Sequence, residues 1–113
     1  MRASELATFV VTPGATTIVV QVSGEIDISN AALLAATLRD VIGDGRTGRP
    51  APRVVLDLSE LRFLDAQGLA ALVEGQQLAE ACGMSFALAR PSHMVRKMLS
   101  ITGLDETFLV AED

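Results

Sequence analysis

The sequence contains no tryptophan, no tyrosine, a single cysteine and a single histidine. The lone cysteine, Cys82, excludes a disulfide within the chain and fits a reducing compartment. We expect its thiol to behave as a small buried hydrophobe that packs within a helical layer. Because His93 is the one histidine, a structural zinc site lacks ligands, and helix packing or a helix cap explains both residues better than a Cys–His nucleophile pair.

Basic residues are also scarce. Nine lysine and arginine residues stand against fourteen aspartate and glutamate residues, which gives a net charge of -5. A chain of this charge repels the phosphates of nucleic acids and the surface of anionic membranes. The N-terminal residues lack a signal-peptide pattern, and no segment approaches the roughly 20 apolar residues of a membrane span. We therefore expect a cytoplasmic protein with no nucleic-acid partner and no direct membrane insertion.

Hydrophobic residues are plentiful, at 50% of the 113 residues, and 20% of the residues are charged. This composition supports a compact core, which must be aliphatic because aromatic residues make up 4%. The length predicts a single domain over residues 1–113.

The stretch 53–73 organises the rest of the chain. Residues 54–58 form a mostly aliphatic run that predicts a buried strand, and a helix begins near Ala66. Between them the chain turns over residues 63–68, where the carboxylate of Asp65 can accept the free N–H groups of the helix's first turn. A strand that leads into a helix N-terminus presents a surface rich in hydrogen-bond donors, and we expect the working end of the protein here.

The remaining segments alternate between strand and helix. We predict an N-terminal hairpin from strands 6–11 and 17–22, with a type II turn at Pro13-Gly14 and a polar segment, 23–27, leading out of the second strand. Further predicted elements are a helix over 31–42 capped by Asp27 or Ser29, a loop over 43–52, an end of the central helix near Gly83, a strand over 84–89, a helix from Pro91-Ser92 to Gly103, and a strand over 107–110. This order is typical of an α/β domain with a mixed sheet, in which parallel strands follow the hairpin and the helices pack mainly on one face.

Two patterns could indicate a ligand site. The first, Gly43-x-Gly45-x-x-Gly48, matches the glycines of a dinucleotide-binding loop, but it follows a helix and precedes a strand, which is the reverse of the required context. The second consists of three aspartates near strand ends, Asp27, Asp57 and Asp65, which could approach one another and hold a magnesium ion.

Two helix caps and one strand-end acid explain these aspartates better than a metal site. A phosphoacceptor aspartate would also require a lysine after a later strand, where this chain has Arg90 followed by proline and serine. With no nucleophile–base pair, no metal-ligand set and no cofactor loop, we expect no cofactor and no enzyme, and instead a protein that acts by being bound.

Two motifs resemble the signature of STAS domains, the sulfate-transporter and anti-sigma-factor-antagonist family. The first is Val-Val-Leu-Asp-Leu-Ser at 54–59, and the second is Phe-Leu-Asp-Ala-Gln-Gly-Leu at 63–69. Gly-Glu-Ile-Asp at 24–27 is similar to the family's exit from its second strand, and the order of elements agrees over nearly the whole chain. The resemblance implies a STAS-like fold and, since the domain fills the chain, a stand-alone bacterial anti-sigma-factor antagonist.

In that family the antagonist binds an anti-sigma factor, usually an ATP-binding serine kinase, and so releases a sigma factor for transcription. The kinase inactivates the antagonist by phosphorylating a serine or threonine at the start of the helix after the third strand. The family's Asp-Ser-Ser/Thr-Gly corresponds here to Asp-Ala-Gln-Gly at 65–68, which implies that the phosphoacceptor position falls on Gln67. Because neither Ala66 nor Gln67 has a hydroxyl, we expect no phosphorylation at the usual site, and the neutral Gln67 imitates the unphosphorylated state.

Two interpretations follow from this departure. The protein is either an antagonist that a kinase cannot silence at this site, or an accessory subunit of another regulatory complex or of a lipid- or anion-transport system. A homodimer is compatible with both. Ser29 and Ser59 are nearby hydroxyls, but a helix cap and a strand-end turn explain them better than phosphorylation does.

The predicted partner-binding surface lies around the start of the central helix. We expect Asp65 to fix the helix start, Gln67 to offer its amide to a partner, and Gly68 to let a partner's backbone approach closely. Leu69 and Leu72 are assigned to the core. The full surface comprises Asp27, Ser29, Asp65, Ala66, Gln67 and Gly68.

Overall fold

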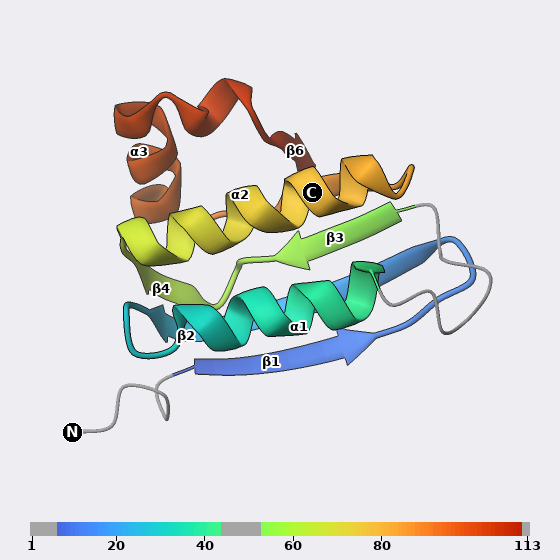
Figure 1. Cartoon of the computed structure of the whole chain (residues 1–113). Coiled ribbons are helices and arrows are strands. Elements are labelled where there is room, and N and C mark those ends of the chain that lie inside the picture. Colours follow the sequence, from blue (N-terminus) through green and yellow to red (C-terminus); the bar gives the residue numbers. More distant parts are fainter. Residues whose placement is uncertain (1–6, 44–52, 112–113) are drawn as a thin grey trace.

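The computed structural model describes residues 7–43 and 53–111 (Figure 1). Most of the glycine pattern at 43–48 therefore lies outside the described residues. The elements are β1 (Ala7–Thr12), β2 (Thr17–Ile26), α1 (Ala31–Gly43), β3 (Arg53–Asp57), β4 (Leu61–Leu64), α2 (Ala66–Ala81), β5 (Ser85–Ala89), α3 (His93–Thr102), the short 3₁₀ helix η2 (Leu104–Glu106) and β6 (Leu109–Ala111).

The described strands form one mixed sheet in the order β1-β2-β3-β5-β6, and β4 pairs with β2 beyond the end of β3. β1 and β2 are antiparallel, whereas the β2–β3, β2–β4, β3–β5 and β5–β6 pairs are parallel. α1 and α2 lie side by side on one face of this sheet, and α3 packs near β4 at one end (Figure 1). The predicted fold class, a mixed sheet with helices mainly on one face, is confirmed.

Two predictions about the strands were wrong. β2 does not end at Val22 but runs to Ile26, because its polar residues alternate with buried ones and so occupy the face of the sheet away from the helices. The segment predicted as a turn before α2, 63–68, begins within the strand β4, which pairs with the last residues of β2 after a register shift between Gly24 and Glu25. Gly24 has a φ of 95°, which a glycine adopts without strain.

The turn between β1 and β2 is not of type II. That turn would need a positive φ at Gly14, and Gly14 is not among the described glycines with positive φ. The glycine is required for space, since a Cβ at this position would lie 2.7 Å from the Thr17 carbonyl oxygen.

The core is mostly aliphatic, as predicted, with Phe86 and Phe108 also buried in it, and lies between the sheet and the helices. Leu69 and Leu72 of α2 are buried in it, and Gly75 lets α1 pack closely because a Cβ there would lie 2.7 Å from the Leu38 Cδ1 atom. α2 also buries one polar side chain, Gln76, whose amide donates to the Thr107 carbonyl and ties the helix to the segment before β6.

The helix ends agree with the sequence except at the cysteine. Ser92 accepts from the Val95 N–H as the N-cap of α3, and Gly103 ends that helix in the left-handed conformation. α2 ends at Ala81, one residue before Cys82, so the thiol is exposed where the chain turns toward β5 and is not the buried thiol that we expected. Among the helices in the described residues, none is long and apolar enough to cross a membrane.

Candidate partner-binding site

The ends of β2 and β4 meet at one end of the molecule. Because the two strands are parallel, their carboxyl ends point the same way, and the Asp65 N–H after β4 donates to the Ile26 carbonyl at the end of β2, at 3.1 Å. α1 and α2 both begin at this end (Figure 1). The fold therefore brings the turn at residues 27–30 beside the start of α2, as the predicted surface requires.

Asp65 is the N-cap of α2, as predicted. Its Oδ1 atom accepts from the Gln67 N–H at 2.9 Å and from the Gly68 N–H at 3.1 Å. These are two of the donors that a helix N-terminus leaves without partners inside the helix. The cap fixes the direction in which the first turn of α2 leaves the sheet.

Asp27 closes the turn before α1 with its carboxylate. The Oδ1 atom accepts from the Ser29 N–H at 2.9 Å and from the Ser29 hydroxyl at 2.6 Å, and these bonds lower the pKa of Asp27. The hydroxyl of Ser29 is thus a donor to Asp27. Of the two caps that the sequence allowed, Asp27 accepts the backbone N–H groups of Ser29 and Ala31, and Ser29 does not cap the helix.

Asn30 completes this turn and was missed by the sequence prediction. It is buried, its side-chain oxygen accepts from the Asp27 N–H at 2.9 Å, and its amide donates to the Glu25 carbonyl at 3.0 Å. The side chains of Asp27 and Asn30 therefore both stabilise this turn, and Ile28 between them is exposed to solvent.

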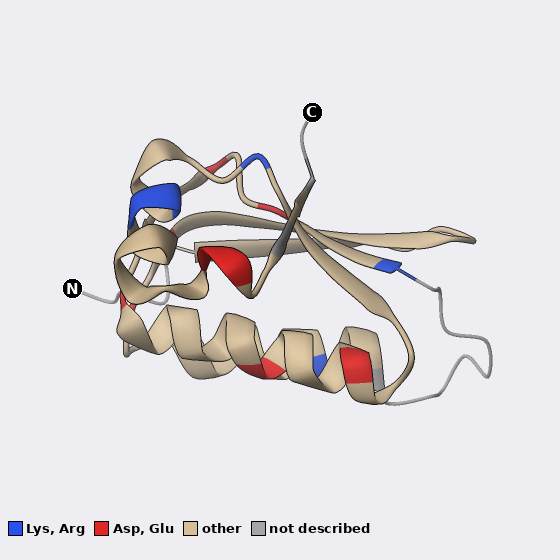
Figure 2. Ribbon diagram, turned by 90° about the horizontal axis from the view of Figure 1, so that it is seen from above, with Lys and Arg blue, Asp and Glu red and all other residues tan. Residues whose placement is uncertain are grey.

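The first turn of α2 is uncharged and partly exposed. Ala66 and Gln67 are exposed, and the helix carries no charged residue before Glu74, so the start of the ribbon is tan in Figure 2. Ile28, at 76% exposure, lies beside this turn and lines a groove together with Gln67. Phe63 of β4 is also exposed, at 44%, but it lies opposite Glu25, on the face of the sheet away from the helices. Neither was predicted, because exposure of a single apolar residue in a strand or turn has no signature in a sequence.

Gly68 faces the core. A Cβ at this position would collide with the Leu64 Cδ1 atom and lie 2.9 Å from the Ile26 Cγ2 atom. Gly68 is buried, so the prediction that it lets a partner's backbone approach is wrong. The glycine instead lets the start of α2 pack onto β4 and the end of β2.

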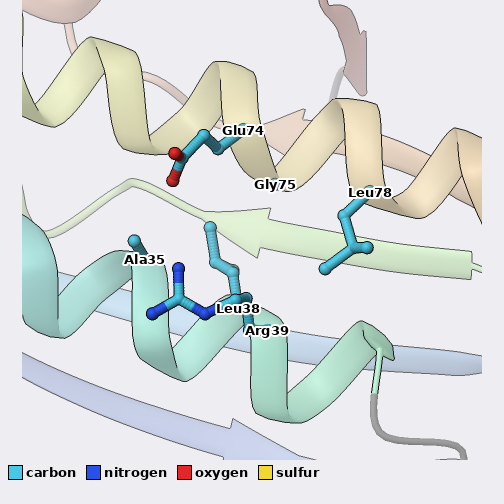
Figure 3. Close-up of a pocket in the computed structure, with 6 residues that line it drawn as sticks. All are labelled: Ala35, Leu38, Arg39, Glu74, Gly75 and Leu78. Atoms are coloured by element: carbon cyan, nitrogen blue, oxygen red, sulfur yellow. The ribbon is translucent and has the colours of Figure 1, made fainter.

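A groove runs between α1 and α2 from this turn. Its first part has a volume of ≈ 230 Å³ and is lined by Ile28, Ala31, Ala32, Ala35, Gln67, Ala70, Ala71 and Glu74. The second part, of ≈ 180 Å³, shares Ala35 and Glu74 and continues to Leu78. Figure 3 shows the guanidinium of Arg39 and the carboxylate of Glu74 on opposite walls, pointing toward one another.

Asp57, the third predicted carboxylate, is engaged elsewhere. It pairs with Arg90 and accepts from the Ser59 N–H at 3.0 Å, at the strand-end turn that we predicted for Ser59. Burial raises the pKa of Asp57, but the hydrogen bonds from Ser59 and the Arg90 guanidinium outweigh this effect and hold the pKa below its ordinary value. We predicted no partner for Arg90.

The three aspartates thus have separate partners: Ser29 for Asp27, Arg90 and Ser59 for Asp57, and the backbone of α2 for Asp65. In the described part of the chain, no three His, Cys, Asp or Glu side chains are grouped as a metal would require. The geometry at the end of β2 and β4 is that of an exposed surface with polar and apolar side chains.

Solved structures share this fold. An anti-sigma factor antagonist from Mycobacterium paratuberculosis superposes with a TM-score of 0.80 at 30% sequence identity, over 97% of this chain and 89% of that one. The unphosphorylated anti-sigma factor antagonist SpoIIAA has a TM-score of 0.73 at 21% identity, over 92% of this chain and 88% of that one, which is a likeness of fold. The chain is thus an α/β domain of the type found in anti-sigma factor antagonists.

The family follows from the sequence match. A family model described as "Mlab, STAS domain" matches residues 11–111, and the chain belongs to the STAS domain family. The anti-sigma-F factor antagonist RsfB of Mycobacterium tuberculosis is 33% identical over 92 residues, which cover 80% of this chain and 69% of RsfB. Antagonists of this kind are regulatory proteins and not enzymes.

Proposed function

We propose that this protein is an anti-sigma-factor antagonist, a single STAS domain over residues 1–113 that binds an anti-sigma factor in the cytoplasm and regulates transcription by partner switching. The similarity to RsfB and to the M. paratuberculosis antagonist supports this function. The observation that carries it is the uncharged first turn of α2, which is capped by Asp65, exposes Ala66 and Gln67, and lies beside the exposed Ile28.

In this proposal the contacts are divided between exposed and supporting residues. Ala66, Gln67 and Ile28 contact the partner, and the Gln67 amide exchanges hydrogen bonds with it. Asp65 holds the start of α2, and Asp27 with Ser29 holds the turn that presents Ile28. Exposed apolar residues beside a few polar groups are typical of the centre of a protein–protein interface.

The proposed partner is an anti-sigma factor of the ATP-binding serine kinase type. If Gln67 occupies the phosphoacceptor position, such a kinase finds no hydroxyl at residues 66 and 67. The surface then stays open to the partner, and control passes to the abundance of the protein or to a second partner.

A second function is favoured by the same lack of a hydroxyl and by the family model, whose description names Mlab. In this alternative the domain is an accessory subunit of another regulatory complex or of a lipid- or anion-transport system. The two functions differ in the partner, since the first requires a kinase–sigma pair and the second requires transporter subunits. Affinity purification from the native cytoplasm with mass spectrometry distinguishes them.

The surface itself is tested with the charged variant Gln67→Glu. A carboxylate in the first turn is compatible with a helix N-terminus, so the fold should remain intact. At the interface the added charge must lose its water, and we expect the affinity for the purified anti-sigma factor to fall about 10-fold or more. Isothermal titration calorimetry measures the change.

Gln77→Glu is the matched control, because Gln77 is also exposed on α2 but lies beyond the first turns. It should bind as wild type does. Equal affinities of the Gln67→Glu variant and wild type would mean that the partner docks elsewhere.

A further inference from the structure

The outer edge of β1 is a surface that the proposed function does not use. β1 pairs with β2 on one side, and among the described strands no other pairs with it. An edge strand exposes a row of N–H and C=O groups, which proteins usually protect with charged residues, proline or a bulge. β1, Ala-Thr-Phe-Val-Val-Thr, contains no charged residue and no proline, and its register with β2 has no shift.

Side chains on both faces of β1 are available for contact. Phe9 lies opposite Val22 on the face that the helices cover, and Val10 lies opposite Gln21 on the other face. Val10 is 48% exposed and Val11 is 41% exposed. The strand therefore offers backbone hydrogen bonds together with apolar area.

We propose that β1 pairs antiparallel with β1 of a second copy of this chain, about a two-fold axis at Val10. In this register Val10 lies opposite Val10 of the second copy, Phe9 opposite Val11, and Thr8 opposite Thr12. Aromatic residues opposite β-branched ones, and threonine opposite threonine, are favourable cross-strand pairs. Directly opposed residues share a face of the sheet, so α1 and α2 of both copies lie on the same side of one continuous sheet.

The occupant is a second copy because the strand is complementary to itself. Each pair in this register is apolar or a pair of threonines. Although the chain has a net charge of -5, none of its charged residues lies within β1. Two-fold pairing therefore opposes no like charges in the strand, and two-fold dimers are the commonest symmetric assemblies. A strand pair of this length buries less than the roughly 1,000 Å² of a stable complex, so we expect a reversible dimer with a dissociation constant on the order of 10–100 μM.

The dimer is independent of the proposed antagonist function. β1 pairs with one edge of β2, whereas β3 and β4 pair with the other. The start of α2, which follows β4, therefore stays accessible when β1 is paired. Failure of one proposal leaves the other standing, since they are tested with different variants.

Sedimentation equilibrium with Val10→Lys tests the surface. Lysine on an edge strand opposes pairing with its own copy through repulsion, so we expect the dimer dissociation constant to rise about 10-fold or more. Ile101→Lys is the matched control, because Ile101 is an aliphatic residue of α3 at 73% exposure, and it should dimerise as wild type does. Circular dichroism verifies that both variants fold.

A cysteine pair tests the register in a Cys82→Ser background, which removes the exposed native thiol. Val10→Cys should form a disulfide-linked dimer under mild oxidation, because the two β-carbons are opposed, whereas Thr8→Cys should not, since its copies are four residues apart in register.

A wild-type protein that remains monomeric at concentrations up to about 500 μM would overturn the dimer. A dimer that Val10→Lys leaves unchanged, or that crosslinks through Thr8→Cys and not Val10→Cys, would overturn the proposed β1 pairing.

Discussion

The ion pair between Asp57 and Arg90 joins the ends of two neighbouring parallel strands, β3 and β5. Arg90 has a φ of 52°, the one positive φ among the described residues other than glycine. Such a conformation costs about 1–2 kcal/mol in an L-residue, and the ion pair helps to offset it. Because Asp57 also accepts from the Ser59 N–H, it holds the turn that leads to β4 and, beyond it, to Asp65.

We predict that Asp57→Asn destabilises the protein by about 1–2 kcal/mol at pH 7, since Arg90 loses its charged partner but is half exposed to water. The folded-state pKa of Asp57 lies below its unfolded value of about 3.9, so the carboxylate stabilises the protein above that value. This stabilisation is lost as the pH falls through the folded-state pKa. The difference in free energy of unfolding between wild type and the variant should therefore be constant near neutral pH and shrink below about pH 4.

Urea denaturation over a pH series measures this difference. Asp40→Asn, on the exposed side of α1, is the control and should change the stability by less than about 0.5 kcal/mol. A difference for Asp57→Asn that grows as the pH falls would contradict the assignment.

Single residues could be predicted where the interaction is local. The cap at Asp65 and the stop at Gly103 depend on residues within one helical turn, so the sequence predicted them. Asp57 and Arg90 are 33 residues apart, and their pairing depends on which strand lies beside β3. The order of strands in the sheet could not be predicted from the sequence. The contact of Gly68 with Ile26 depends in the same way on the pairing of β4 with β2.

At the scale of elements, the start of α2 combines a structural role with the proposed contact surface. We predict that Asp65→Ala costs about 1 kcal/mol, because the Gln67 and Gly68 N–H groups lose their acceptor, and that it also weakens binding of the anti-sigma factor. Chemical denaturation and isothermal titration calorimetry measure the two effects separately.

Ser92→Ala removes the corresponding cap of α3 and provides the comparison. It should lower the stability by a similar amount, about 0.5–1 kcal/mol, and leave the affinity unchanged. If both cap variants weaken binding equally, the loss at Asp65 reflects stability alone and not the contact surface.

The elements that the sequence missed are those that depend on strand pairing. β4 has four residues, Leu-Arg-Phe-Leu, with the two leucines buried and the residues between them exposed, a spacing of three that does not match the strand period of two. Its existence as a strand follows from parallel pairing with β2, a contact between residues about 37 positions apart. Long helices such as α2 were predicted because their pattern repeats over several turns.

At the scale of the whole molecule, the fold collects the proposed surface from two distant parts of the chain, the turn after β2 and the start of α2. The alternation of strands and helices predicted the fold class, and parallel strand ends predicted that Asp27 and Asp65 would lie near one another. The exposed Ile28 beside this surface was found only in the structure. The surface is uncharged in its first helical turns although the chain carries a net charge of -5.

Because the first two turns of α2 carry no charged side chain, one phosphoryl group there would strongly change the charge of the proposed surface. We predict that the double variant Ala66→Ser with Gln67→Ser, which gives residues 65–68 the Asp-Ser-Ser-Gly sequence that the resemblance implies for the phosphorylation site, becomes phosphorylated by an anti-sigma kinase in the presence of ATP. The phosphate adds a charge of about −1.5 to −2 to the surface proposed for the partner, so the complex should dissociate. Intact-mass spectrometry counts the phosphoryl groups, and titration calorimetry measures the affinity before and after ATP is added.

Wild type should remain unmodified under the same conditions and keep its affinity. Gln77→Ser, which places a hydroxyl on an exposed part of α2 away from its first turn, should also remain unmodified and shows whether the kinase requires the helix start. Phosphorylation of wild type at Ser29 or Ser59 would contradict the view that this surface is permanently open, because the molecule would then carry a switch at another hydroxyl. A phosphorylated double variant that still binds tightly would place the docking surface away from α2.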